Sequence, residues 1–277
     1  MAHVTIVVAT RNCAGSLQRC LDSVARQKDA RCEIVVIDGA SSDATPRLLA
    51  DNRARGTIAD YVSEPDSGVY CAFNKGVRRA RGEWIGFLGC DDVLHDPLVV
   101  RDLLDAARSA PPGCRVIYGK VNLRSAAGDL LETVGRPWQQ ARTAFLDGSS
   151  LPHPAALHHR SLFEARGLFD ESYRIAGDYE LLLRELLHAE PLFLDRILVD
   201  MRVGGLSKRP DTIPVVLAEV IRARRQHGLG EASNRLKRAL LVARAGAAAH
   251  AVLGPRVFGI LADAGRVVRG KPRVWTR

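Results

Sequence analysis

The chain has 277 residues, which is long enough for one large domain or two small ones and too long for a disulfide-stapled miniprotein. Hydrophobic residues make up 47% and charged residues 26% of it, a balance that excludes a disordered chain, a collagen-like repeat and a multi-span membrane protein. The formal net charge is +9, and all of the excess lies in the last sixth of the chain.

The first third of the chain alternates strand and helix patterns. The β-branched run at 4–9 predicts a strand buried on both faces, and an apolar stripe at helical spacing, which includes Cys20, follows it. Strand patterns are found at 4–9, 33–37, 59–63 and 84–88, and helix patterns at 17–24, 45–53 and 70–80. This alternation predicts an α/β fold with a mostly parallel sheet flanked by helices.

The remainder of the chain is less regular. Its strand patterns are found at 116–123, 130–134, 155–159 and 192–203. The first two of these flank a short turn and predict a hairpin. Asp178 stands where the N-cap of a helix is expected, and the chain beyond Pro214 is predicted to be wholly helical.

Polar and acidic side chains follow each strand of the first third. In a parallel sheet flanked by helices, ligands bind at the carboxyl ends of the strands. The candidates for a binding site are therefore the residues just after these strands, which are Thr10, Arg11, Asn12, Asp38, Glu64, Pro65, Asp66, Gly89, Cys90, Asp91 and Asp92. Carboxylates follow three of the four strand patterns, those at 33–37, 59–63 and 84–88.

Asp91 and Asp92 are adjacent carboxylates at the end of an apolar strand. Two such groups repel each other unless they share a proton or a cation, so the pair indicates a divalent metal. The alternative is that Asp92 caps the next helix or faces solvent. The carboxylates of Asp38 and Asp66 at neighbouring strand ends favour the metal.

Six segments follow one another in the order VTIVVATRN, EIVVIDGASSDAT, SEPDSGVYCAFNKGVRRARGEWIGFLGCDD, HPAALHHRSLF, FDESYRIAGDYELLLRELL and GGLS. Together they resemble family 2 glycosyltransferases with the GT-A fold, and most of all the bacterial enzymes that build cell-surface polysaccharides and glycolipids. The resemblance implies a nucleotide-diphospho-sugar donor, a lipid-linked or saccharide acceptor, Mg²⁺ or Mn²⁺, and inversion at the anomeric carbon. The chemistry agrees, because a metal neutralises the charge that develops on a departing pyrophosphate.

Carried over by position, the resemblance assigns the strand-end residues to the donor. Asp92 resembles the metal-contacting aspartate that ends the family's DxD-like motif, and Asp91 resembles the one that faces the ribose. The first aspartate of that motif is absent, since Gly89 and Cys90 stand there. Asp38 resembles the aspartate that binds the base, and the rest of the predicted donor pocket is Thr10, Arg11, Asn12, Asp66, Asn74 and Lys75. The alternative for the last three residues is turn formation or a solvated helix face.

Asp178 matches the aspartate of the family's Glu-Asp element, which implies that it is the general base. An inverting transfer needs a carboxylate that takes the proton of the acceptor hydroxyl as the new bond forms. Gly177 replaces the preceding Glu of that element, and we expect Glu180 to substitute for it. A plain helix cap is the alternative for Asp178.

Three histidines, His153, His158 and His159, invite a zinc interpretation, but no fourth ligand is visible. Strand alternation sends the last two to opposite faces, which disfavours a shared ligand role. His153 instead matches a family histidine near the pyrophosphate or the acceptor.

The basic tail is predicted to be an appended surface. Residues 232–277 hold ten basic residues and one acidic residue, Asp263. Apolar residues at helical spacing lie between them at Leu236, Ala239, Leu240, Ala243, Val257, Leu261, Ala264 and Val268. We expect peripheral attachment to an anionic cytoplasmic leaflet, with a helix packed on the catalytic domain as the alternative. Nucleic acid is not expected, because the tail has few aromatic residues.

The predicted organisation is a GT-A catalytic domain at 1–210 and a helical basic extension at 211–277. Within the first domain, 1–115 is the nucleotide-binding half and 116–210 the acceptor-side half. The six cysteines lack CxxC or zinc spacing, and the apolar N-terminal run is too short for a signal peptide. These features predict a cytoplasmic protein in a reducing compartment, peripheral on the inner face of the plasma membrane.

Three other functions are alternatives to glycosyl transfer. A sugar nucleotidyltransferase resembles a different opening, with a glycine-rich loop and a catalytic Lys or Arg, whereas this chain has ATRNCAGS. A Rossmann dehydrogenase requires GxGxxG after the first strand, and that segment is missing. A non-catalytic nucleotide-sugar-binding protein of the same fold, associated with the membrane, stays open.

Overall fold

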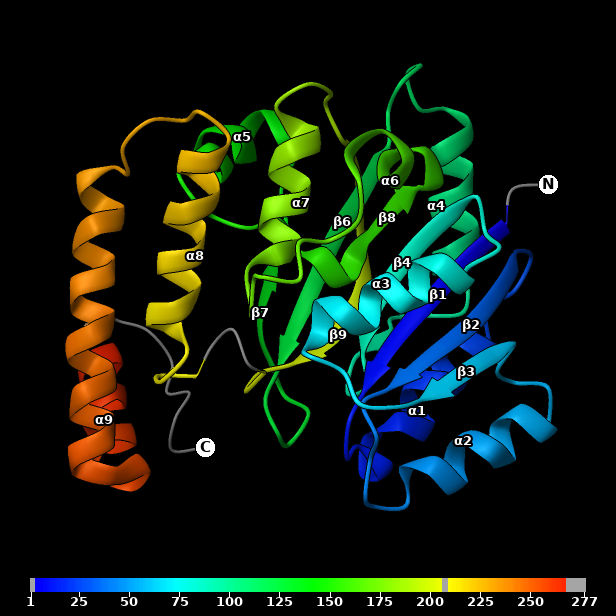
Figure 1. Cartoon of the computed structure of the whole chain (residues 1–277), viewed down its shortest axis with the longest axis horizontal. Helices are drawn as coiled ribbons and strands as arrows, with labels where there is room; N and C mark the ends of the chain where they lie inside the picture. The colour runs from blue at the N-terminus through cyan, green and yellow to red at the C-terminus, as the bar shows by residue number, and fades with distance from the viewer. Residues whose placement is uncertain (1–2, 206–208, 268–277) are drawn as a thin grey trace.

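The computed structural model describes residues 3–205 and 209–267. Its described part holds one nine-stranded sheet with helices on both faces (Figure 1). The strands are β1 (His3–Thr10), β2 (Arg31–Asp38), β3 (Asp60–Ser63), β4 (Trp84–Gly89), β5 (Val93–Leu94), β6 (Val116–Arg124), β7 (Leu130–Val134), β8 (Ala156–His159) and β9 (Leu192–Arg202). The helices are α1 (Ala14–Ala25), α2 (Thr45–Ala54), α3 (Val69–Arg79), α4 (Val99–Arg108), α5 (Trp138–Leu146), the 3-10 helix η1 (His153–Ala155), α6 (Arg160–Arg166), α7 (Gly177–Leu186), α8 (Ile213–Gln226) and α9 (Asn234–Val267).

The sheet is parallel in its first half and mixed in its second. The strand order is β3-β2-β1-β4-β8-β6-β9-β5, with β7 beside β6. Strands β1 to β4 pair in parallel, which confirms the predicted α/β fold. Strand β8 runs antiparallel to both of its neighbours, and β6 pairs with β7 as the predicted hairpin. The short turn between β6 and β7 requires antiparallel pairing of these two strands.

Two hydrophobic clusters lie on the two faces of the sheet because strand residues alternate in direction. Val4, Ile6 and Val8 of β1 pack on one face with α1, α2 and α4. Val7 of β1 packs on the other face with α3, α5 and α7. Cys20 is fully buried in the first cluster, as its place in the apolar stripe predicts.

Helix α3 lies close against β1, and this approach depends on a glycine. A Cβ atom added at Gly76 would meet Cγ1 of Val7 at 2.3 Å. Any side chain at position 76 would therefore lift α3 from the sheet. The first turn of α3 carries Tyr70, so the close packing fixes where this side chain lies relative to the ends of the parallel strands.

The C-terminal helices α8 and α9 stand beside the sheet domain (Figure 1). The cluster that contains Phe145 and Leu181 also contains Val220, Ala223 and Leu236, so the core continues across residue 210. The predicted domain boundary at 210 stays a prediction. The described residues beyond Pro214, up to Val267, are helical as expected, apart from the turn between α8 and α9 and a break inside α9 at Gly254 (φ 75°, ψ 164°).

Within the described residues, none of the helices is both long enough and apolar enough to cross a membrane. Several predicted features fall outside the described residues: Leu206 and Ser207 of the GGLS segment, Val268 of the second apolar stripe, and the basic residues Arg269, Lys271, Arg273 and Arg277.

Candidate active site

The predicted donor residues share one edge of the sheet. In the parallel register, Thr10 at the end of β1 pairs with Asp38 of β2, and Ala9 pairs with Gly89 of β4. The loops that follow these three strands therefore leave the sheet side by side. The hydroxyl oxygen of Thr10 is buried without a hydrogen-bond partner in the described part of the chain.

The loops after β1 and β2 are held together by hydrogen bonds. The Asp38 carboxylate is fully buried and accepts hydrogen bonds from the Ser41 backbone N–H at 3.0 Å and from the Ser63 hydroxyl at 2.5 Å. Asn12, whose φ of 52° is left-handed, accepts a hydrogen bond from the Ser42 N–H at 2.8 Å. Asp38 thus organises the loop that would form one wall of the pocket.

Asp66 and Arg11 meet at this same wall. A Cβ added at Gly39 would lie 2.8 Å from Oδ2 of Asp66 and 3.5 Å from Cδ of Arg11. The loop after β3 therefore closes on the loops after β1 and β2, and Gly39 has no side chain that would keep them apart.

Asn74 and Lys75 of α3 have structural partners. Asn74 is buried, donates to the carbonyl of Phe169 at 2.9 Å and to the Glu171 carboxylate at 2.8 Å, and accepts from the Phe169 N–H at 3.0 Å. Lys75 pairs with Glu64 at 2.8 Å. These contacts favour the structural alternative for both side chains over direct contact with a nucleotide.

Asp92 has the features of a metal ligand. It is 5% exposed, and its Oδ2 accepts a hydrogen bond from the Gly89 N–H at 3.1 Å, while its Oδ1 has no partner among the described residues. Burial, and next the adjacent Asp91 carboxylate, raises the pKa of Asp92 to about 7, although the Gly89 N–H lowers it. Asp92 does not cap a helix, because α4 begins at Val99.

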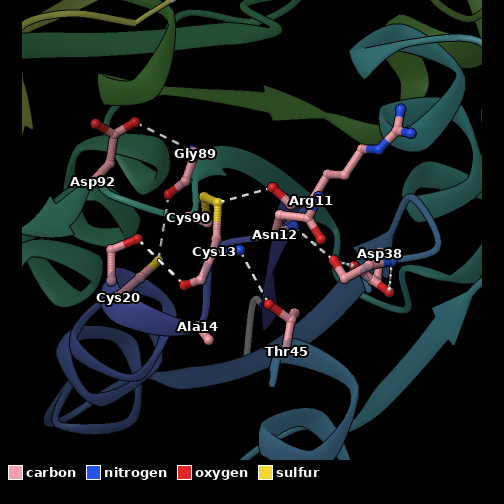
Figure 2. The surroundings of a disulfide bond; sticks show 12 residues. Arg11, Asn12, Cys13, Ala14, Cys20, Asp38, Thr45, Gly89, Cys90 and Asp92 are labelled. Carbon is pink, nitrogen blue, oxygen red and sulfur yellow. Dashed lines mark hydrogen bonds between the residues drawn. A yellow bond between two sulfur atoms is a disulfide. The ribbon is translucent and has the colours of Figure 1, made fainter. Parts of the chain in front are cut away.

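A disulfide joins the loops after β1 and β4 (Figure 2). It links Cys13 to Cys90, with their Cα atoms 6.4 Å apart and 77 positions of sequence between them. Cys13 follows Asn12, and Cys90 directly precedes Asp91, so the bridge spans the candidate donor edge. The sequence analysis expects a reducing compartment and pairs none of the cysteines. Sequence spacing alone does not reveal which cysteines meet in the fold.

Asp178 lies in the first turn of α7 and is not its N-cap, which is Ala176. Its Oδ1 accepts a hydrogen bond from the Tyr179 N–H at 2.8 Å and lies 3.2 Å from the Tyr70 hydroxyl. The same hydroxyl also donates to the carbonyl of Ile175. Burial raises the pKa of Asp178 to about 6, while the hydrogen bonds from Tyr179 and Tyr70 lower it.

Glu219 of α8 supports the segment before Asp178. Its carboxylate accepts three backbone hydrogen bonds, from Arg174 at 2.6 Å, Ile175 at 2.9 Å and Ala176 at 2.8 Å. Its negative charge also contributes to raising the pKa of Asp178. The sequence contained no signal for this residue, because α8 was assigned to the C-terminal extension.

Glu180 has two ion-pair partners. It is buried and its carboxylate pairs with Arg184 and with His227, each at 2.8 Å. One of these partners belongs to the same helix and the other follows α8, and the expectation that Glu180 supports Asp178 stays a prediction.

His153 is buried in an aromatic cluster. Its ring stacks on Phe87 with centroids 5.4 Å apart, and burial lowers its pKa to about 4. His158 is buried beside it, whereas His159 is partly exposed and caps α6 by accepting from the Ser161 N–H at 3.3 Å. Among residues 3–205 and 209–267, no group of three or more His, Cys, Asp or Glu side chains could hold a metal ion.

Asp178 and His153 both line a cavity of about 570 Å³ between α3, α5, α7, α8 and the β6–β7 hairpin. Tyr70 lines the same cavity and belongs to α3, whose N-terminus follows Asp66 closely in sequence. Helix α3 therefore connects the donor edge of the sheet to the cavity that holds Asp178.

Comparison with known proteins agrees with this arrangement. Residues 5–164 match the family Glycosyl transferase family 2. The chain is 32% identical over 183 residues to the PGL/p-HBAD biosynthesis glycosyltransferase of Mycobacterium bovis, covering 65% of this chain and 68% of that protein. It is also 32% identical over 200 residues to the succinoglycan biosynthesis protein ExoO of Rhizobium meliloti, covering 66% of this chain and 55% of that protein.

Solved structures share the fold. The mannosyltransferase PcManGT from Pyrobaculum calidifontis, in complex with GDP-Man and Mn²⁺, superposes with a TM-score of 0.62 at 21% identity, over 96% of this chain and 80% of that one. S. aureus TarS 1–349 in complex with UDP-GlcNAc gives 0.62 at 18% identity, over 86% and 70%. With a family match over more than half of its length, the chain belongs to glycosyl transferase family 2.

Proposed function

We propose that this glycosyltransferase moves a sugar from a nucleotide-diphospho-sugar to an acceptor hydroxyl with inversion, in the synthesis of a cell-surface polysaccharide or glycolipid. The observation that carries the proposal is the Asp178 carboxylate, which lines a cavity and is connected to the donor edge through α3. A carboxylate on the far side of the sugar from the leaving group is what an inverting displacement requires.

The donor contacts are assigned to the strand-end loops. Thr10, Arg11, Asn12, Asp38 and Asp66 form the wall around the nucleotide, and Asp91 faces the ribose. The unpartnered Thr10 hydroxyl and the joined loops support this assignment. Nucleotide sugars bound to proteins of the same fold, UDP-GlcNAc in TarS and GDP-Man in PcManGT, support the donor class.

The residues present fit a divalent cation, Mg²⁺ or Mn²⁺. Asp92 offers an unpartnered, buried carboxylate oxygen, and hard cations prefer oxygen ligands. Bound there, the cation would neutralise the negative charge of the leaving pyrophosphate. Because the described residues include no three-ligand cluster, Asp92 contributes only part of the coordination, and Mn²⁺ in the PcManGT complex supports the same need in this fold.

Asp178 takes the proton of the acceptor hydroxyl. With a pKa of about 6 it is mostly ionised at pH 7 and is a stronger base than an ordinary carboxylate. Tyr70 and the Tyr179 N–H fix its orientation, and Glu219 holds the backbone before it. His153, neutral at pH 7 because its pKa is about 4, lies on the acceptor side of the same cavity.

The C-terminal helix is proposed to contact an anionic membrane surface. Leu236 of the predicted stripe is buried against the core, so this residue follows the packing alternative. Another face of α9 carries exposed apolar residues, with Leu241 64% and Val252 84% exposed, and Arg238 and Arg244 are exposed near it. An apolar helix face flanked by cations is suited to an anionic interface.

Vesicle co-sedimentation tests this contact. The double variant Leu241→Asp and Val252→Asp is compared with Leu130→Asp, which changes an exposed apolar residue on β7. We expect the wild type and the β7 variant to sediment with phosphatidylglycerol vesicles, and the double variant to stay in the supernatant. Equal sedimentation of all three proteins would end the membrane proposal.

The transfer proposal is tested with a panel of nucleotide sugars and Mn²⁺. A cognate donor raises the melting temperature in proportion to ln(1 + [L]/Kd), so a thermal-shift screen identifies it. Proton NMR of the product then reports the anomeric configuration, which we expect to be opposite to that of the donor. Retention of configuration would contradict the inverting mechanism, and donor binding without turnover would favour the non-catalytic alternative.

A further inference from the structure

We propose that the acceptor carries an apolar alkyl or aryl group next to its reacting hydroxyl, and that the cavity beside Asp178 binds this group. The inference rests on the proposed function of Asp178 as the base. It narrows the acceptor from any saccharide or lipid-linked hydroxyl to a hydrophobic alcohol or phenol.

The inner wall of the cavity is mostly alkyl and aromatic. The apolar lining residues come from α3, β6, α5, β9 and α8. They include Phe73, Leu123, Phe145, Met201, Val216 and Val220. The volume of about 570 Å³ falls in the range of small-molecule pockets, which are lined mostly by apolar side chains. A hydrophobic group that enters it is removed from water, which favours binding.

Four polar side chains of the wall, Tyr70, Ser150, Asp178 and Tyr179, have hydrogen-bond partners, whereas the buried Nε2 of His153 has none within the described residues. The Tyr179 hydroxyl donates to the carbonyl of Phe145 at 3.1 Å, and the Ser150 hydroxyl donates to the carbonyl of Leu151 at 3.0 Å. The Tyr70 hydroxyl lies between Ile175 and Asp178. A saccharide seated here would bury several hydroxyls with few partners, and each unsatisfied group costs free energy.

The charged groups of the lining lie at its margin or at the base. Arg136 and Arg174 are exposed, and His153 is neutral at pH 7. Asp178 is the one acidic residue among the lining residues, and the aromatic side chain of Tyr70 lies directly beside it in the wall. The apolar surface therefore begins beside the carboxylate, which places an apolar group adjacent to the hydroxyl that it deprotonates.

A binding experiment tests the cavity without turnover. The probes are 2-naphthol, an aryl alcohol, and 1-decanol, an alkyl alcohol, each added to the full-length protein in a thermal-shift titration. Ala144→Phe fills the cavity from α5, and Thr143→Phe adds the same ring on the exposed neighbouring position. We expect at least one probe to stabilise both the wild type and Thr143→Phe. In Ala144→Phe we expect the binding of that probe to be roughly tenfold or more weaker.

The two probes distinguish an aryl from an alkyl occupant. Ala144→Phe also changes the packing of α5, so a second variant is needed. Val216→Thr changes the polarity of the wall at nearly constant size, and we expect it to weaken the binding of the same probe. If neither probe binds, or both variants bind as well as the wild type, the inference is overturned.

A transfer assay with the donor found in the screen completes the test. We expect the preferred probe to accept sugar roughly tenfold or more faster than maltose does at equal concentration. Faster transfer to maltose would overturn the apolar acceptor while leaving the glycosyltransferase proposal intact. If Asp178→Asn instead retains full transfer, the assignment of Asp178 as the base is contradicted. The cavity assignment still stands in that case, provided that the probe continues to bind.

Discussion

The hydroxyl of Tyr70 lies 3.2 Å from Oδ1 of Asp178, although 108 positions separate the two residues in the sequence. Tyr70 belongs to α3, which packs on the parallel strands that end at the donor edge, and Asp178 belongs to α7 in the mixed half of the sheet. The contact therefore connects the helix that packs beside the donor edge to the carboxylate proposed as the general base.

Tyr70→Phe is expected to move the pH dependence of transfer. The Tyr70 hydrogen bond lowers the pKa of Asp178 against the effect of burial, so its removal raises that pKa above about 6. Because the base must be ionised, activity is lost as pH falls through its pKa, and the acid limb of the kcat profile shifts to higher pH. Tyr179→Phe is the control, since that hydroxyl donates to Phe145. Identical acid limbs in the wild type and Tyr70→Phe would show that the contact does not act on the base.

Glu219→Ala is expected to loosen the segment that precedes Asp178. Three backbone N–H groups lose their acceptor, so the base is less well positioned and kcat falls roughly tenfold, while the Kd of the donor is unchanged. Glu219→Gln keeps one acceptor oxygen and is expected to recover part of the loss. Glu164→Ala, on the exposed face of α6, is the control. A loss of donor binding equal to the loss of kcat would point to general unfolding instead.

Asp92→Asn is expected to remove the metal response. Steady-state transfer by the wild type should fall on treatment with EDTA and return with Mn²⁺, because the cation offsets the charge of the leaving group. The variant should lose roughly a hundredfold or more of the metal-dependent rate. Asp91→Asn is the comparison, because Asp91 is assigned to the ribose. This variant should bind the nucleotide more weakly and still respond to Mn²⁺. An unchanged Mn²⁺ response in Asp92→Asn would rule out this ligand.

Reduction of the Cys13–Cys90 bridge is expected to destabilise the protein. The bridge closes a loop across 77 positions, and loss of such a crosslink typically costs about 2–4 kcal/mol. Urea unfolding with and without dithiothreitol measures the difference. Cys13→Ser should no longer respond to the reductant, whereas Cys114→Ser, which changes a free cysteine, should respond as the wild type does. A wild type that is indifferent to reductant would mean that the bridge does not contribute.

The donor edge was predictable because it follows from local patterns. Apolar β-branched runs identify β1, β2 and β4, and alternation with helices makes them parallel, so Thr10, Asp38 and Asp91 had to leave the sheet on one side. The family resemblance supplied the candidate role of Asp178, which no periodic pattern indicates.

The remaining features depend on contacts between distant residues. Glu219 lies on a helix that sequence patterns assign to the extension, and only the packing of α8 on α7 brings it to the Arg174–Ala176 backbone. Which of the six cysteines pair depends on Cα distances that spacing does not encode. The resemblance places Asn74 beside the nucleotide, and no local pattern indicates that its amide donates to the carbonyl of Phe169, 95 positions away.

Transfer by Asp178→Asn, with donor binding measured in the same protein, tests the general base most directly. Asparagine keeps the shape of the side chain but cannot accept the proton, so we expect kcat to fall by ~10²–10⁴-fold while the donor still raises the melting temperature as in the wild type. An Asp178→Asn enzyme that transfers sugar at the wild-type rate would contradict the assignment of this carboxylate.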